Sequence, residues 1–204
     1  MKLQSLPQFL WDRLQAETIS VDLIKIMFDL VLAAKLIGYN ISRNKFLEVT
    51  SGHSHSNHIS TESHPLNILA HDIFRSYLEK SGKVACHLSS EITGKAIRED
   101  KSQHTSYIAF INPLDYSNSL DTLESSGSIF SVYPRLENRG AVKTGRLQKL
   151  VGYFLYGNSI TLVLSLGEGV QVFSYDHHIG EFLLTHPNLK ICKESTTYFT
   201  KEES

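Results

Sequence analysis

A polar turn that follows an apolar strand is the segment of this sequence most suited to chemistry. The apolar run 107–111 leads into Asn112, Pro113, Leu114 and Asp115, and a turn rich in Ser and Asn separates it from a run that begins with Gly. A carboxylate at a strand end is a natural ligand for a hard cation, and successive turn N–H groups can hold a phosphate. Turns of this composition are common in proteins, so a purely structural turn is the simpler interpretation of these residues alone.

A second candidate is the polar stretch 49–64, which reads as a loop and contains His53, His55 and His58, with His64 further on. The spacing H-x-H-x-x-H can ligate a transition metal. No Cys or acidic residue joins these three histidines at tight spacing. A solvated polar loop is the favoured interpretation, and metal binding is the alternative.

A hydrolase triad is a third pattern to weigh, because Ser117 follows Asp115 closely and His177 lies further along the chain. The G-x-S-x-G motif that exposes a nucleophilic serine is missing around Ser117, so a catalytic triad is not expected. His177 and His178 fall between two strand-like segments, which favours a surface turn.

Two helices and a series of strands must position these residues. Apolar residues recur at helical spacing over 19–39, with Ser20 as N-cap and Gly38 as the expected end, and again over 65–81 after Pro65. The strand-like segments are 83–88, 107–111, 127–133, 151–156, 160–166, 169–174 and 181–185. Two helices followed by strands joined at Gly-containing turns predict an α+β fold, with helices packed on a mixed, largely antiparallel sheet.

Composition excludes several classes of protein. The 204 residues carry a formal net charge of −1, and Lys and Arg form no run longer than two, so nucleic acid is not an expected partner. The most apolar stretch, 21–37, is interrupted by charges, so we expect no membrane span and no membrane partner. Cys86 and Cys192 are too few for a disulfide framework, which fits a cytoplasmic protein. We expect residues 1–204 to form a single domain.

Three separate segments carry a resemblance to a known family. Residues 112–135 read NPLDYSNSLD, TLESS and GSIFSVYPR; residues 151–164 read VGYFLYGNSITLVL; and residues 169–184 read GVQVFSYDHHIGEFLL. Their order and spacing resemble the D-P-L-D-G-S-S-N-I-D, A-G-Y-x-x-Y-G-S and G-V-x-x-F-x-x-D signatures of the fructose-1,6-bisphosphatase class 1 family. The likeness covers most of residues 9–200 and implies the N-terminal half of that family's αβαβα sugar-phosphatase fold.

The resemblance implies a magnesium-dependent phosphoric monoester hydrolase of carbohydrate metabolism. In the family, clustered carboxylates hold Mg²⁺ ions that polarise the phosphoryl group, activate a water and stabilise the leaving alkoxide. Carried over by position, the first acid of D-P-L-D falls on Asn112 and the second on Asp115. The family's S-E-E has become S-S-E, with Ser90 replacing one acid and Glu91 kept. Asp72 takes the place of a helix acid that positions the water.

We therefore expect Glu91 and Asp115 to be the remaining metal ligands, and Asp72 and Glu91 to be the remaining catalytic acids. The phosphate-binding turn falls on Tyr116, Ser117 and Asn118, with Tyr116 where the family has a Gly that lets backbone approach phosphate. Two formal charges are lost from a site for divalent cations, and Mg²⁺ needs anionic ligands to release its waters. Mg²⁺ binding is expected to be weak or absent.

The resemblance also bears on two further sites of the family, the sugar-binding site and the AMP site. Its sugar-binding residues lie mainly in a second domain that begins just after the segment matching 196–203, and its sugar-contacting Asn falls on Lys201. We expect that C-terminal domain to be absent from this chain. The family's AMP site is built around G-T-G-E-L-T, whereas the matching stretch AETISVDLI lacks the glycines. AMP inhibition is not expected.

Two functions follow as hypotheses. The favoured one is a fructose-1,6-bisphosphatase-like protein that has lost catalysis and keeps a binding or regulatory role, as a homo-oligomer or in a hetero-oligomer with a full-length homologue. The alternative is weak Mg²⁺-dependent hydrolysis of the 1-phosphate of fructose 1,6-bisphosphate by Asp115, Glu91 and Asp72. A truncated gene product is a further alternative.

Overall fold

The computed structural model describes residues 3–51, 65–88, 105–115, 126–135, 145–191 and 194. Its helices are α1 (Leu6–Gln15), α2 (Val21–Ser51) and α3 (Pro65–Ser81), with a short 3-10 turn at Gly145–Leu147. Its strands are β1 (Val84–Leu88), β2 (Tyr107–Asp115), β3 (Ser126–Pro134), β4 (Leu150–Tyr156), β5 (Ile160–Ser165), β6 (Val170–Asp176) and β7 (Glu181–Leu189).

Within these ranges, seven strands form one sheet in the order of the sequence, β1 to β7. β1 and β2 are parallel, with Val84 opposite Tyr107 and Leu88 opposite Ile111, whereas every later pair is antiparallel. The parallel pair needs a crossover, while the hairpins need only short turns. The predicted mixed, largely antiparallel sheet is confirmed.

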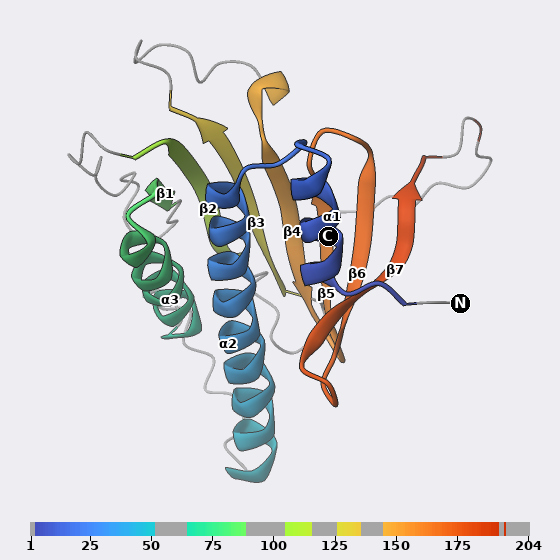
Figure 1. Ribbon diagram of the computed structural model, residues 1–204. Coiled ribbons are helices and arrows are strands. Elements are labelled where there is room, and N and C mark those ends of the chain that lie inside the picture. Colours follow the sequence, from blue (N-terminus) through green and yellow to red (C-terminus); the bar gives the residue numbers. More distant parts are fainter. Residues whose placement is uncertain are drawn as a thin grey trace.

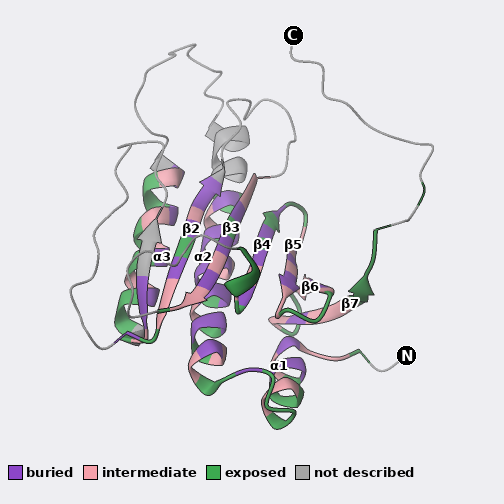
Figure 2. Cartoon of the chain, turned by 90° about the horizontal axis from the view of Figure 1, so that it is seen from above, coloured by how far each residue is buried: buried purple, intermediate pink, exposed green. Residues whose placement is uncertain are grey.

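The three helices lie on one face of the sheet, with α2 passing over its middle and α3 beside α2 (Figure 1). α3 packs on β1 and β2 as well as on α2, and α2 contacts β4. Fully buried aromatic rings from the strands, among them Phe130, Phe154 and Phe173, fill the space beneath the helices. Each such ring contributes roughly 1.5–3 kcal/mol through burial of apolar surface. Buried residues follow the inner sides of α2 and the central strands (Figure 2).

Gly38 does not end the second helix as predicted, because α2 continues unbroken to Ser51. Its role is instead a close approach between the helix and the sheet. A Cβ atom at position 38 would lie 2.6 Å from Cδ1 of Ile160 and 3.4 Å from Cδ1 of Tyr156. The helix tolerates the glycine since tertiary packing outweighs its low helix propensity. Residues 49–51, predicted as the start of a loop, instead form the last residues of α2, and residues 52–64 lie outside the described ranges.

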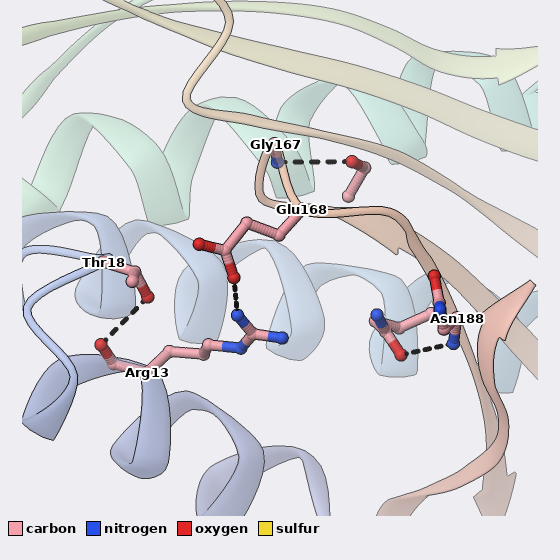
Figure 3. Close-up of polar contacts among 7 residues, drawn as sticks. Arg13, Thr18, Gly167, Glu168 and Asn188 are labelled. Atoms are coloured by element: carbon pink, nitrogen blue, oxygen red, sulfur yellow. Dashed lines mark hydrogen bonds and ion pairs between the residues drawn. The ribbon is translucent and has the colours of Figure 1, made fainter.

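The sequence patterns missed α1, a ten-residue helix whose N-cap Ser5 accepts a hydrogen bond from the backbone of Gln8. Backbone bonding ties its start to the edge strand β7, since Leu184 donates to the carbonyl of Gln4 at 2.8 Å. Its other end is held by an ion pair between Arg13 and Glu168 in the β5–β6 turn (Figure 3). None of the described helices is long and apolar enough to cross a membrane.

The strand predictions are confirmed with small changes at their ends, except that β2 and β7 each continue four residues beyond the predicted end, to Asp115 and Leu189. The His177–His178 segment is an exposed turn between β6 and β7, as predicted. The Oδ1 atom of Asp176 accepts hydrogen bonds from the backbone N–H of His178 at 2.8 Å and of Ile179 at 3.3 Å. These bonds form an Asx turn, which explains the hairpin by its backbone geometry.

Candidate functional site

The parallel pairing of β1 and β2 brings two candidate segments to one edge of the sheet. Leu88, the last residue of β1, lies opposite Ile111, so the chain leaves β1 beside Asn112 of β2. Because carboxyl ends of parallel strands share an edge, a residue shortly after β1 and one at the end of β2 can serve one site. The S-S-E segment at 89–91 starts there, although Ser90 and Glu91 themselves lie outside the described residues.

A β-bulge sits in the middle of the N-P-L-D segment. Asn112 pairs with Ile129 of β3, and Asp115 pairs with Gly127, so three residue steps on β2 oppose two steps on β3. Pro113 suits the extra residue because it has no N–H to contribute to the strand pairing. Pro113 and Leu114 are both buried, so the pleat changes phase between them. As a result the backbone positions 112 and 115 lie on the same face of the sheet, which an unbroken strand would not allow.

A buried hydrogen-bond chain fixes this bulge. The Ser128 hydroxyl on β3 donates to the carbonyl oxygen of Pro113 at 2.5 Å, and its Oγ lies 2.7 Å from the hydroxyl of Tyr156 on β4. Both side chains are buried. Burial raises the pKa of Tyr156 well above its usual range, against a smaller lowering by the bond to Ser128, so the phenol stays protonated and can donate to Ser128.

Gly127 completes the anchor opposite Asp115. A Cβ atom at this position would lie 2.9 Å from the carbonyl oxygen of Phe154 on β4. The absence of a side chain therefore lets β3 and β4 approach closely at the point where β2 ends. The anchoring role of Ser128 and Tyr156 was not predicted. The two residues lie on neighbouring strands, 28 positions apart in the sequence, and no sequence pattern indicates a hydrogen bond between them.

Asp72 lies on the outer side of α3. Its side chain is 67% exposed, and its Oδ1 is 3.7 Å from Nδ1 of His71. At 100° per residue it falls on the same side of the helix as the exposed Arg75–Glu79 ion pair, opposite Phe74, which packs on the sheet. The structure therefore does not bring Asp72 onto the sheet-facing side of α3, and its catalytic role stays a prediction.

Asn67, in the first turn of α3, is a half-buried amide. At 100° per residue it lies about 20° from Phe74, and so near the sheet-facing side of the helix. α3 is joined to β1 by only Gly82 and Lys83 and packs on β1 and β2, so the start of α3 lies toward the carboxyl ends of these strands. Asn67 thus lies at the same end of the domain as Asn112. The sequence patterns gave no reason to single it out, because a lone amide on an amphipathic helix is common.

The remaining predicted site residues are Glu91, Tyr116, Ser117 and Asn118, and they fall outside the described residues, as does the His53–His55–His58 segment. Asp115 is described through its backbone in β2. In the part of the chain that is described, no group of three or more His, Cys, Asp or Glu side chains is arranged to hold a metal ion.

The described donor set does not suit Mg²⁺. The half-buried Asn112 offers a neutral amide oxygen beside the bulge, and the carboxylate of Asp72 points away from the sheet into solvent. Mg²⁺ is held in proteins through anionic oxygens because it gives up its waters reluctantly. The described part of this segment is therefore an anchored strand end that offers a cation one neutral amide oxygen.

The chain is similar to known proteins over nearly all of its length. The family model described as "Fructose-1-6-bisphosphatase, N-terminal domain" matches residues 4–187. A fructose-1,6-bisphosphatase class 1 from Cytophaga hutchinsonii is 36% identical over 90% of this chain and 55% of the relative. One from Leptospira biflexa is 34% identical over 98% of this chain and 62% of the relative.

Solved structures agree with these relatives. The holo form of Leishmania major fructose-1,6-bisphosphatase superposes with a TM-score of 0.72 at 28% identity, over 96% of this chain and 59% of that protein. The apo form of the same protein gives the same TM-score and identity. The chain thus spans 55% to 62% of the length of the curated relatives it matches.

Proposed function

The chain belongs to the fructose-1,6-bisphosphatase family, and on that basis we propose that it is a catalytically impaired member of the family with a residual binding or regulatory role. The relatives named above are fructose-1,6-bisphosphatases of class 1. Their activity belongs to proteins of which this chain spans little more than half. For this chain, a place in carbohydrate metabolism is therefore part of the proposal.

The observation that carries the proposal is the amide at position 112. Asn112 occupies the last regular position of β2 before the bulge, beside the point where the chain leaves β1. The resemblance puts the first acid of D-P-L-D at this position, and an amide supplies one neutral oxygen where a carboxylate supplies two and a full charge. Each lost charged interaction is worth about 1.5–3 kcal/mol, or roughly 10- to 100-fold in affinity for a cation.

Retention of the scaffold around position 112 favours a binding role over simple decay. The bulge, the bond from Ser128 to Pro113 and the close approach at Gly127 all depend on particular residues that are present. A protein that retains the structure of this strand end but binds metal weakly is expected to combine these anchoring contacts with fewer charged residues. Tyr116, Ser117 and Asn118 are the proposed phosphate-contacting residues.

The second candidate function is weak Mg²⁺-dependent hydrolysis of the 1-phosphate of fructose 1,6-bisphosphate, with Asp115, Glu91 and Asp72 as the remaining acids. The observation in its favour is the identity of 36% and 34% to the two named class 1 relatives. A cation would then be held by fewer acids than the family uses, so activity would require high Mg²⁺.

The test is phosphate release from fructose 1,6-bisphosphate by the purified chain at several millimolar Mg²⁺ or Mn²⁺. We expect no turnover above that of the Asp115→Ala variant, which serves as the matched blank. Turnover that Asp115→Ala abolishes would overturn the impaired-enzyme proposal and establish the second candidate. Retained binding of the sugar phosphate is measured in parallel by isothermal titration calorimetry, and no heat at millimolar ligand would remove the binding role.

A further inference from the structure

The face of the sheet turned away from the helices is apolar. The described helices α1, α2 and α3 all lie on the opposite face (Figure 1). Four large apolar side chains are exposed on the helix-free face, with relative exposures of 36% for Phe110 on β2, 52% for Ile129 on β3, and 39% for both Tyr153 and Leu155 on β4. We call the surface formed by these four residues, Val163 of β5 and Val172 of β6 the outer sheet face.

The strands alternate in a way that makes both sides of the sheet apolar. In β4, Phe154 is buried beneath the helices, while its neighbours Tyr153 and Leu155 point to the other side. An antiparallel sheet with one solvated face normally has polar residues at its outward positions. Along the described strands β3, β4 and β5, however, no outward position carries a charged residue. Such near-continuous apolar runs are typical of strands that are covered on both faces.

The exposed residues form a continuous row across the sheet. Ile129 pairs with Tyr153, and Tyr153 pairs with Val163. Val163 in turn pairs with Val172. Neighbouring strands lie about 4.8 Å apart, so the row is about 14 Å wide. Ile129 also pairs with Asn112 of β2, so the row reaches the candidate functional site. The outer sheet face is therefore one contiguous patch, which marks an interaction surface more clearly than scattered apolar residues do.

We propose that the outer sheet face binds the same face of a second copy of this chain, with the two sheets packed face to face about a twofold axis near Tyr153. Two sheets that pack in this way keep their strand directions within about 30° of each other, and their side chains interdigitate. Tyr153 lies in the middle of the row, between Ile129 and Val163. Because a twofold contact is isologous, a residue near the axis meets its own counterpart.

The alternation of large and small side chains suits a pairing of identical faces. Phe110 lies opposite Ser131, and Leu155 lies between Gly127 and Thr161. Each of these large side chains therefore has a small neighbour, which leaves space above it for a large side chain of the second copy. Interdigitation of this kind is how two sheets form a common core.

Charge favours a second copy as the partner. A face that carried charges of one sign would repel its own copy, whereas the outward positions of β3, β4 and β5 carry none. A partner with a charged surface would have to bury its charges here without any opposite charge to pair with. The outer sheet face therefore suits an uncharged, apolar partner surface, and the same face of another copy is such a surface.

The size of the face sets the expected strength. With the half-buried residues between them, its exposed side chains present on the order of 600 Å² of apolar surface, the upper end for the largest patch on a typical monomer. Two copies would then bury on the order of 1,200 Å² in total, at the lower limit of standard specific interfaces. The expected product is a dimer with a micromolar dissociation constant, which separates on dilution.

The first test is site-specific cross-linking in a Cys86→Ser, Cys192→Ser background. Tyr153→Cys should be joined to its counterpart by a short bis-maleimide at about 100 µM protein, well above a micromolar dissociation constant. Ile179→Cys, in the exposed β6–β7 turn, is the matched control and should give only background cross-linking. A monofunctional maleimide should label both thiols in dilute protein and label Tyr153→Cys more slowly in concentrated protein.

Two results of this test would overturn the proposal. One is a Tyr153→Cys thiol that reacts freely at high protein concentration and gives no more cross-linked dimer than Ile179→Cys. The other is a Tyr153→Cys thiol that stays protected at every dilution, because another segment of the same molecule would then cover the face. Association through any other surface does not bring two Tyr153→Cys thiols together, so the readout is specific to the outer sheet face.

The second test introduces a charge at the centre of the contact. Ile129→Glu, added to Tyr153→Cys, should raise the protein concentration needed for half-maximal cross-linking by roughly 30-fold or more, as for a central contact residue. Ile179→Glu makes the same change at an isoleucine of similar exposure, 60% against 52%, and should leave that concentration unchanged. Circular dichroism and thermal unfolding establish that both variants fold. A folded Ile129→Glu variant that cross-links like its parent would contradict the proposal. Neither test involves metal or sugar phosphate, so each is independent of the proposed function.

Discussion

The hydroxyl of Ser128 and the carbonyl oxygen of Pro113 lie 2.5 Å apart, which ties the middle of the N-P-L-D bulge on β2 to the neighbouring strand β3. The bond is buried, and a second hydroxyl, that of Tyr156, meets Ser128 from the other side at 2.7 Å. The strand end that the family resemblance marks for metal binding is therefore anchored to β3 and β4, and the resemblance aligns Asn112 in it with the first acid of D-P-L-D.

Removing the Ser128 hydroxyl should destabilise the domain. In Ser128→Ala, the carbonyl of Pro113 and the buried phenol of Tyr156 both lose their partner, and a buried unsatisfied polar group costs about 1–3 kcal/mol. The free energy of unfolding from urea denaturation should fall by that amount. Ser131→Ala, on the opposite face of the same strand and only partly buried, should stay within about 0.5 kcal/mol of wild type. Equal losses in the two variants would mean that the Ser128 bond does not stabilise the bulge.

Tyr156 should give the protein a specific sensitivity to high pH. Its pKa is raised in the folded state by burial, so above pH 10 an unfolded chain releases this proton while the folded chain keeps it. Stability from this group is complete below pH 10 and falls as pH rises further, by about 1.4 kcal/mol per pH unit. Urea unfolding at pH 9 to 11.5 should show a steeper decline for wild type than for Tyr156→Phe. If the free energy of unfolding declines equally with pH in wild type and Tyr156→Phe, the phenol of Tyr156 is exposed to water and its pKa is not raised by burial.

Gly152 in β4 should tolerate no side chain. A Cβ atom there would lie 2.2 Å from the carbonyl oxygen of Val163 and 2.8 Å from Cζ of Phe130, and the first of these is backbone that cannot move aside. We expect Gly152→Ala to lower the free energy of unfolding by about 3 kcal/mol, near the upper end for overpacking. Gly145→Ala is the control, since its nearest contact would be 3.9 Å away. A fully stable Gly152→Ala would contradict the tight packing of β4 against β5.

The spacing of apolar residues and the positions of Gly and Pro predicted most of the fold. Alternating or continuous apolar runs bounded by Gly-containing turns located the strands of the sheet, and Pro65 marked the start of α3. These signals are local, so one stretch of chain is enough to reveal them. The fold class followed because two helices before a run of hairpins leave few ways to bury one face of a sheet.

Features that depend on contacts between distant residues could not be predicted. Gly38 looked like a helix end because glycine has low helix propensity, yet its meaning lies in the approach of Ile160 from another element. The bulge in β2 had only Pro113 as a local sign. The short helix α1 has three buried apolar residues, too few for a clear periodic signal.

Mn²⁺ binding measured by electron paramagnetic resonance tests the central claim, that the amide at position 112 in an otherwise intact segment weakens metal binding. Restoring the two acids in Asn112→Asp, Ser90→Glu should tighten Mn²⁺ binding on the order of 100-fold over wild type, since each regained charge contributes at least about 1.5 kcal/mol. Asn158→Asp, in the exposed β4–β5 turn, adds a charge away from the site and should change nothing. Wild-type chain that already binds Mn²⁺ as tightly as the restored variant would contradict the account.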